Sequence, residues 1–119
     1  MRDMRPRIKS NFVSFTDGTG RIYGVKNRVI TSVKQEVVHF DAATVGERRF
    51  WDAYVAGIQI NEALKVPLGT NVQRGDVLEH DGSQYEVRQI DLKQEGLTQY
   101  ILLSLSAIPI AFNINLEEP

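Results

Sequence analysis

The sequence predicts a mainly β protein: a small antiparallel β-barrel or sandwich with one short α-helix packed on it. Short stretches rich in β-branched and aromatic residues recur along the chain, Gly and Asp-Gly turns separate them, and a single stretch has helical periodicity. No strand–helix–strand spacing repeats, which argues against a parallel sheet. The 119 residues fit one domain, 1–119, in which we expect 1–10 to form a flexible basic arm and 107–119 a strand-like C-terminal tail.

The first elements are predicted to be short strands joined by a turn. Residues 11–15 and 21–26 have strand composition, and Asp17-Gly18-Thr19-Gly20 between them suits a hairpin turn because Asp-Gly tolerates positive φ. A longer strand, rich in β-branched residues, covers residues 29–40. Neither of its faces is cleanly apolar, so we expect a bend or bulge near Lys34 and Gln35.

The single predicted helix covers residues 44–56. Thr44 and Glu47 have the spacing of a capping box, and Gly57 suits a left-handed helix stop. The apolar arc consists of Phe50, Trp51, Ala53, Tyr54 and Val55, and the polar face carries Arg48, Arg49 and Asp52. Because so short a helix is not stable alone, we expect its aromatic arc to pack on the sheet.

The remaining pattern is again that of strands. Residues 58–67 return to strand, residues 68–76 are rich in turn formers, and a hairpin follows with Asp81-Gly82 at its tip. A further turn at residues 94–96 leads to a nearly continuous apolar strand, 100–105, typical of burial on both faces. Five apolar residues then alternate from Ile108 to Leu116, which predicts a half-buried strand that starts, at Pro109, on a sheet edge or bend.

Composition and motifs argue against catalysis and specific ligands. The chain has no cysteine, which excludes a disulfide framework and cysteine-ligated zinc, and its net charge of −1 gives no global attraction to nucleic acid or anionic membranes. No apolar run is long enough for a bilayer span or a secretory signal. His39 and His80 lack metal-ligand spacing, and we expect His80 to be solvated at its hairpin tip. We therefore predict no enzyme, no cofactor and no metal site.

The candidate functional residues belong to possible interfaces. They are Arg5 and Arg7 near the start, Arg48 and Arg49 on the helix, and Ile110, Phe112 and Ile114 in the tail. The basic start is either a solvated terminus or a phosphate-facing or partner-facing arm. The helix arginines are either a solvated face or the lining of a channel or acidic contact. The tail pairs either with its own sheet or with the sheet of a neighbouring subunit.

Several short motifs, in this order, resemble those of the head-closure (head–tail joining) proteins of long-tailed bacteriophages. The motifs are Glu47-Arg48-Arg49-Phe50-Trp51, residues 63–67, Asp76-Val77, Asp81-Gly82 with Tyr85-Glu86-Val87, and residues 102–105. The resemblance covers about residues 37–106. The N-terminal strands are only generically similar, and the alternating tail extends beyond the point where such proteins are expected to end.

The resemblance implies a structural role in the virion. Such proteins form a ring beneath the portal and adaptor, close the DNA-filled head and receive the tail. It implies portal, adaptor and tail proteins as partners, DNA that passes through the ring without specific binding, no membrane, and a place in the virion neck after assembly in the host bacterial cytoplasm. We expect the isolated chain to be a monomer or weak oligomer. The alternatives are another phage tail subunit, such as a tail terminator, and a nucleic-acid-binding small β-barrel, for which Tyr23 near Arg21 and Lys26 is the one aromatic–basic cluster.

Overall fold

Every regular element that the structure describes is a β-strand, which confirms the mainly β prediction. The structure is a computed structural model that describes residues 14–43, 57 and 59–117. The strands are β1 (Gly18–Lys26), β2 (Val29–Ala43), β3 (Glu62–Pro67), β4 (Val77–His80), β5 (Ser83–Glu95), β6 (Thr98–Ala107) and β7 (Asn113–Ile114). The helix predicted for residues 44–56 lies outside the described residues.

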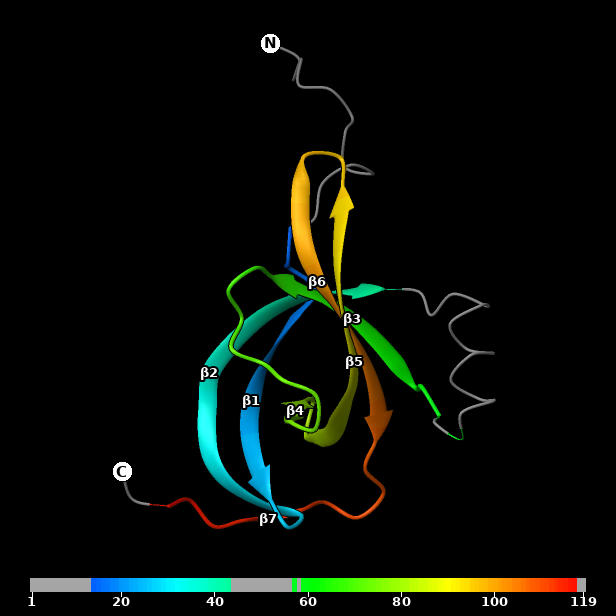
Figure 1. Cartoon of the computed structure of the whole chain (residues 1–119). Coiled ribbons are helices and arrows are strands. Elements are labelled where there is room, and N and C mark those ends of the chain that lie inside the picture. Colours follow the sequence, from blue (N-terminus) through cyan, green and yellow to red (C-terminus); the bar gives the residue numbers. More distant parts are fainter. Residues whose placement is uncertain (1–13, 44–56, 58, 118–119) are drawn as a thin grey trace.

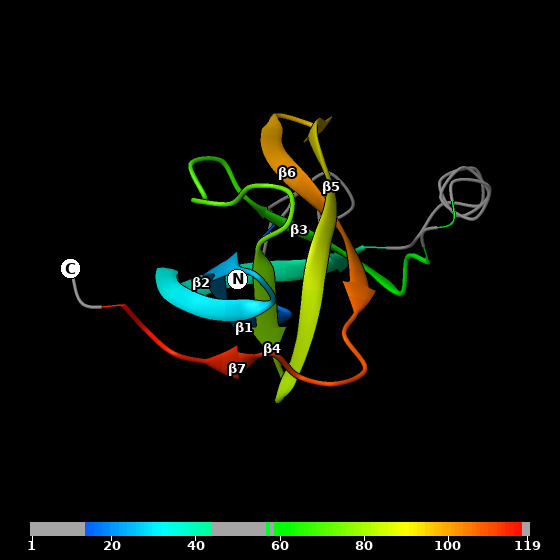
Figure 2. The ribbon, with the colours of Figure 1, turned by 60° about the horizontal axis from the view of Figure 1, so that its bottom comes forward.

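The strands form one sheet whose two ends meet (Figure 1). Hydrogen-bonded neighbours follow the order β1-β4-β5-β6-β3-β2, and β2 pairs back onto β1, so that these six strands make a closed ring of antiparallel pairings. β7 lies on the outer edge of β2 and runs parallel to it. Figure 2 shows β4 between β1 and β5, although fifty residues separate β1 from β4 in sequence.

The turn predicted at residues 17–20 is wrong, because β1 already begins at Gly18. The chain reverses instead at Asn27 and Arg28, which have φ values of 51° and 64°. Gly18 is needed for a close approach rather than for a turn, since a Cβ there would lie 2.7 Å from the Phe40 ring. Of the strand predicted for residues 11–15, residues 14 and 15 are described and are not in a strand.

The bend predicted near Lys34 and Gln35 is confirmed as a β-bulge. Opposite β1, Ile22 faces Gln35 and the next residue, Tyr23, faces Val33, so Lys34 is an extra residue on β2. One further register shift lies on each side of this bulge, between Gly20 and Ile22 and between Gly24 and Val25. Bulges bend a strand and increase its twist, and β2 accordingly curves around β1 in Figure 1.

Two apolar clusters make up the buried core, and they take adjacent residues of β1 and β4, whose side chains point to opposite faces of the sheet. The larger one consists of Ile22, Val38, Phe40, Leu64, Val66, Leu78, Val87, Leu103 and Leu105. The smaller one consists of Tyr23, Ile30 and Val77, with Val25, Val33, Ile108 and Phe112 packed against it. The second cluster therefore depends on side chains that arrive from the C-terminal tail.

The later strand predictions are largely confirmed. β3 covers residues 62–67 of the strand predicted for 58–67, whereas residues 59–61 are described and are not in a strand. Residues 68–76 form a loop, and Asp81 and Gly82 make the β4–β5 turn with φ values of 52° and 76°. Two positive φ values in a two-residue loop match the right-handed twist of the paired strands. β6 contains the predicted apolar run. The turn that precedes it lies at Gly96 and Leu97, whereas residues 94 and 95 of the predicted turn, 94–96, belong to β5.

The half-buried strand predicted from Ile108 to Leu116 is wrong as a continuous element. Only Asn113 and Ile114 pair as a strand, and the chain bends at Pro109 and Ile110. Ile108 and Phe112 are half-buried, whereas Ile110 is 84% exposed. Beyond Phe112 the described tail pairs with the edge of β2, and Glu117 lies 3.2 Å from Lys26 of β1. Its apolar side chains Ile114 and Leu116 are left about half exposed.

Candidate assembly surfaces

The C-terminal segment, defined here as residues 108–117, is fastened to the ring through Gln84. The Phe112 backbone N–H donates to Gln84 Oε1 (2.7 Å), and Gln84 Nε2 donates to the Phe112 carbonyl (3.2 Å). The Gln84 amide thus imitates the backbone of a neighbouring strand. Ile108 N–H also donates to the Gln84 carbonyl at 3.0 Å. Because Gln84 is only 7% exposed, its amide depends on the segment for hydrogen-bond partners.

Of the three predicted interface residues in this segment, one is anchored to its own subunit and two are not. The Phe112 ring packs against the Tyr23–Ile30–Val77 cluster, and the Arg28 guanidinium lies 6.0 Å from its centroid. Ile110 is 84% exposed and Ile114 is 51% exposed. The structure therefore leaves Ile110 and Ile114 available to a partner and gives Phe112 a packing role.

The tip of the β5–β6 hairpin is a second apolar surface, which the sequence analysis missed. Figure 1 shows the hairpin rising past the end of β3. Leu92 lies opposite Ile101, on the same face as the half-buried Ile90, yet is 68% exposed, and Leu97 in the turn is 95% exposed. The inward-facing alternation continues beyond the ring into solvent. The length of the strands was the signal that could have revealed this surface, because β5 and β6 are longer than β3, the neighbour of β6.

The tip of this hairpin is contacted by Lys65 of β3. Its Nζ atom lies 2.7 Å from Glu95 Oε1 and 5.2 Å from the Tyr100 ring centroid. The hydrogen bond from Lys65 to Glu95 raises the pKa of the Lys65 ammonium. Lys65 thus ties the hairpin to β3 at Glu95, which lies between the exposed Leu92 and Leu97 along the chain.

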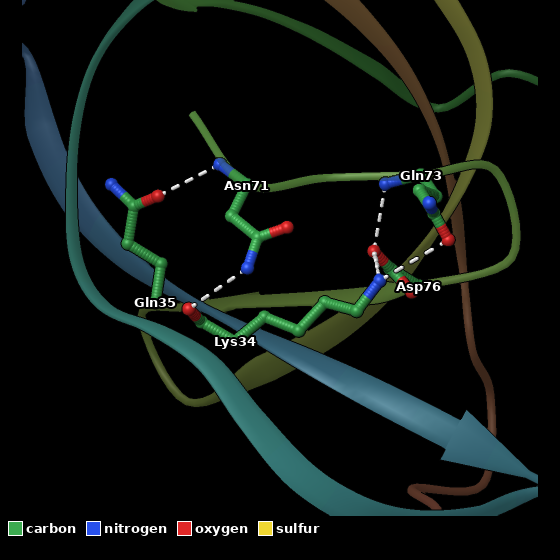
Figure 3. Close-up of polar contacts among 5 residues, drawn as sticks. All are labelled: Lys34, Gln35, Asn71, Gln73 and Asp76. Carbon is green, nitrogen blue, oxygen red and sulfur yellow. Dashed lines mark hydrogen bonds and ion pairs between the residues drawn. The ribbon is translucent and has the colours of Figure 1, made fainter. Parts of the chain in front are cut away.

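The loop of residues 68–76 is pinned to the bulge of β2 (Figure 3). Lys34 Nζ lies 2.9 Å from Asp76 Oδ2, and the same oxygen accepts from the Gln73 backbone N–H at 2.7 Å. Gln35 Oε1 accepts from the Asn71 backbone N–H at 2.9 Å. The bulge residues therefore bind the loop by side chains, and Val72 packs against the larger apolar cluster.

His80 is buried, which corrects the prediction that it is solvated. Its side chain is 8% exposed and stacks on Tyr85, with centroids 4.9 Å apart and planes inclined by 11°. Phe40 meets the same ring edge-on at 5.1 Å. The Nε2 atom is hydrogen-bonded to Glu62, which ties β4 to β3 although the two strands do not pair. His39, in contrast, is exposed. These contacts give His80 a structural role, in which its ring connects β4 to β3.

The basic residues named from the sequence are mostly outside the described part of the chain. Four of them lie outside the described residues: Arg5, Arg7, Arg48 and Arg49. The aromatic–basic cluster is described: Arg21 donates to the Tyr23 hydroxyl at 3.3 Å, and that hydroxyl donates to Glu79 Oε1 at 3.3 Å. Because Tyr23 is 3% exposed, its ring is not accessible for stacking on a nucleic-acid base.

The described residues contain neither a metal-binding cluster nor a helix that could span a membrane. Over residues 14–43, 57 and 59–117, no group of three or more His, Cys, Asp or Glu side chains is placed to hold a metal ion. In the same part of the chain, no helix has the length and apolar character for a membrane span.

Comparisons with known proteins found no relative. The chain matches no protein-family model, no curated protein and no solved structure.

Proposed function

We propose that this protein joins the head to the tail of a long-tailed bacteriophage, as a subunit of the ring that closes the DNA-filled head. The observation that carries the proposal is the placement of exposed apolar residues at opposite ends of the ring of strands. Leu92 and Leu97 lie on the β5–β6 tip, and Ile110 and Ile114 lie on the C-terminal segment (Figure 1). A subunit between two different neighbours needs two different contact surfaces.

The interior of the fold suits a mechanical role. Lys34 and Asp76 fix the 68–76 loop, and Glu62 and His80 fix β4 to β3. These contacts join parts of the chain that are distant in sequence, a strand to a loop in one case and two unpaired strands in the other, so they oppose separation of the ring rather than fraying of one hairpin. The order of sequence motifs that resembles the head-closure family supports the same conclusion. In this proposal the protein has a structural role and no catalytic one.

The partners follow from that role. The ring sits in the virion neck, below the portal or adaptor and above the tail proteins, after assembly in the cytoplasm of the host bacterium. The chain's net charge of −1 suits a ring through which DNA passes without specific binding. The six-stranded ring of pairings is in this reading a small β-barrel that presents its two ends to the neck.

The direct test is removal of the gene from the phage or prophage that carries it, followed by electron microscopy of the lysate. We expect DNA-filled heads that lose their DNA, together with complete but unattached tails. Tails of irregular length on closed heads would instead identify a tail terminator. Normal infectious particles would overturn the proposal.

Complementation by variants tests the hairpin surface. Leu97→Asp should fail to restore joined particles, because it places a charge on a 95% exposed side chain at the proposed contact. Gln99→Asp is the matched control, since Gln99 is also exposed near the tip and the change adds the same charge. Restoration by both variants to the same extent would remove the hairpin tip from the contact. Circular dichroism of both purified variants verifies that they fold.

A further inference from the structure

We propose that copies of this chain exchange their C-terminal segments, so that residues 112–117 of one subunit occupy the Gln84 site and the β2 edge of the next. The partner is thus a second copy of this chain. The exchange is a property of the chain alone and does not depend on the function proposed above.

The contact to be exchanged is specific at one point and slight elsewhere. Phe112 is held by the two hydrogen bonds with Gln84 and by packing on the Tyr23–Ile30–Val77 cluster. After Phe112, only Asn113 and Ile114 pair with β2, opposite Val29 and Ile30. Two further bonds follow, from Asn115 N–H to the Ile30 carbonyl and from Glu117 N–H to the Thr31 carbonyl, both 2.8 Å. An identical set of contacts is available to the segment of any other copy.

The connection to the ring suits a hinge. Pro109, Ile110 and Ala111, within the C-terminal segment, join Ile108 to the exchanged residues 112–117, and all three are exposed. The chain bends at Pro109 and Ile110 in the described structure. Opening this bend redirects the segment away from its own subunit without breaking any strand of the ring. Exchange of a terminal element at such a bend is a low-cost route to association, because the native contacts are kept.

Exchange also gives the exposed apolar residues a partner. In the single chain Ile110 is 84%, Ile114 51% and Leu116 50% exposed. Exposed apolar residues on an edge strand favour pairing with another chain. When the segment passes between two subunits, these side chains lie at the new contact between them. Each subunit donates one segment and receives one, and such a head-to-tail contact generates a ring when its rotation closes.

Cysteine pairing tests the exchange, since the natural chain has no cysteine. Val29 and Asn113 are opposite one another in the β2–β7 pair, and paired strands bring Cα atoms within disulfide range. Purified Val29→Cys and isotope-labelled Asn113→Cys proteins are mixed at about 1 mM, which is comparable to the effective concentration within an assembly. After oxidation, mass spectrometry should find dimers that contain one chain of each variant.

The matched control uses two facing positions that the proposal leaves within one chain. Gln94 and Gln99 are opposite one another near the β5–β6 tip, and mixtures of Gln94→Cys and Gln99→Cys should give no such excess of mixed dimers. A double variant, Val29→Cys with Asn113→Cys, oxidised in dilute solution, should lock the segment to its own subunit and abolish concentration-dependent association. Mixed dimers no more abundant than in the control would overturn the inference, and so would unchanged association of the locked protein.

Discussion

Phe112→Ala should lower the free energy of unfolding by about 2 kcal/mol. Truncation of a fully buried Phe costs roughly 3–5 kcal/mol, including the cavity that it leaves. The Phe112 side chain is half-buried, against Tyr23, Ile30 and Val77, so we expect about half of that cost. The hydrogen bonds with Gln84 use the Phe112 backbone and survive the substitution.

The assay is urea denaturation followed by circular dichroism, at a micromolar concentration that keeps the chain monomeric. The midpoint should fall while the dependence of the unfolding free energy on urea concentration is unchanged, because little surface is lost. Ile110→Ala is the matched control. Ile110 belongs to the same segment but is 84% exposed, so its truncation should change stability by less than about 0.5 kcal/mol.

Two results would refute this reasoning. Equal losses for Phe112→Ala and Ile110→Ala would mean that the segment is the continuous half-buried strand that its alternation predicts. No loss for Phe112→Ala would mean that the segment does not pack on the ring, and the site at Gln84 would lose its significance.

Three further predictions concern polar contacts. His80→Ala should cost about 1–3 kcal/mol of unfolding free energy, because the imidazole ring packs between two aromatic side chains. His39→Ala, at an exposed position, should leave the midpoint of the same urea denaturation nearly unchanged. A double-mutant cycle with Lys34→Met and Asp76→Ala should give a coupling of about 1–3 kcal/mol, and additive losses would contradict the link drawn in Figure 3. Burial opposes ionisation of Asp41, but backbone hydrogen bonds outweigh it and lower its pKa. The Asp41 carboxylate should therefore stabilise the fold above its ordinary pKa, and this contribution should be lost as the pH falls through the lowered pKa. The difference in unfolding free energy between wild type and Asp41→Asn should accordingly become smaller in acid. A difference that does not change with pH would contradict a stabilising role for the ionised carboxylate.

The two Asp-Gly dipeptides show where local turn chemistry is sufficient. Asp81-Gly82 forms the predicted turn because the strands on both sides of it pair with each other. Asp17-Gly18 does not, because the strand that follows it pairs with β2 and β4. Both dipeptides permit the same backbone conformations. Whether the dipeptide forms a turn or a strand depends on which strands the residues on either side of it pair with.

The two histidines show that local sequence likewise does not decide whether a side chain is buried. Each lies beside a carboxylate in sequence, and His80 adjoins a turn, which favours solvation. In the fold the end of β4 faces β3, so Glu62 and two aromatic rings enclose His80. Phe40 and Glu62 come from other strands, and no local pattern connects them with His80.

The sequence by itself determined the mainly β character, the bulge at Lys34, the loop of residues 68–76 and the β4–β5 hairpin. These features depend on turn chemistry and alternation, which act over a few residues. Only the tertiary structure decided that β2 closes onto β1, that His80 is buried, and that Leu92 and Ile110 are exposed while Phe112 is held. The physical reason is that alternation assigns a side chain to a face, whereas burial requires a surface opposite that face. In this ring the opposite surface is supplied by strands from distant parts of the chain.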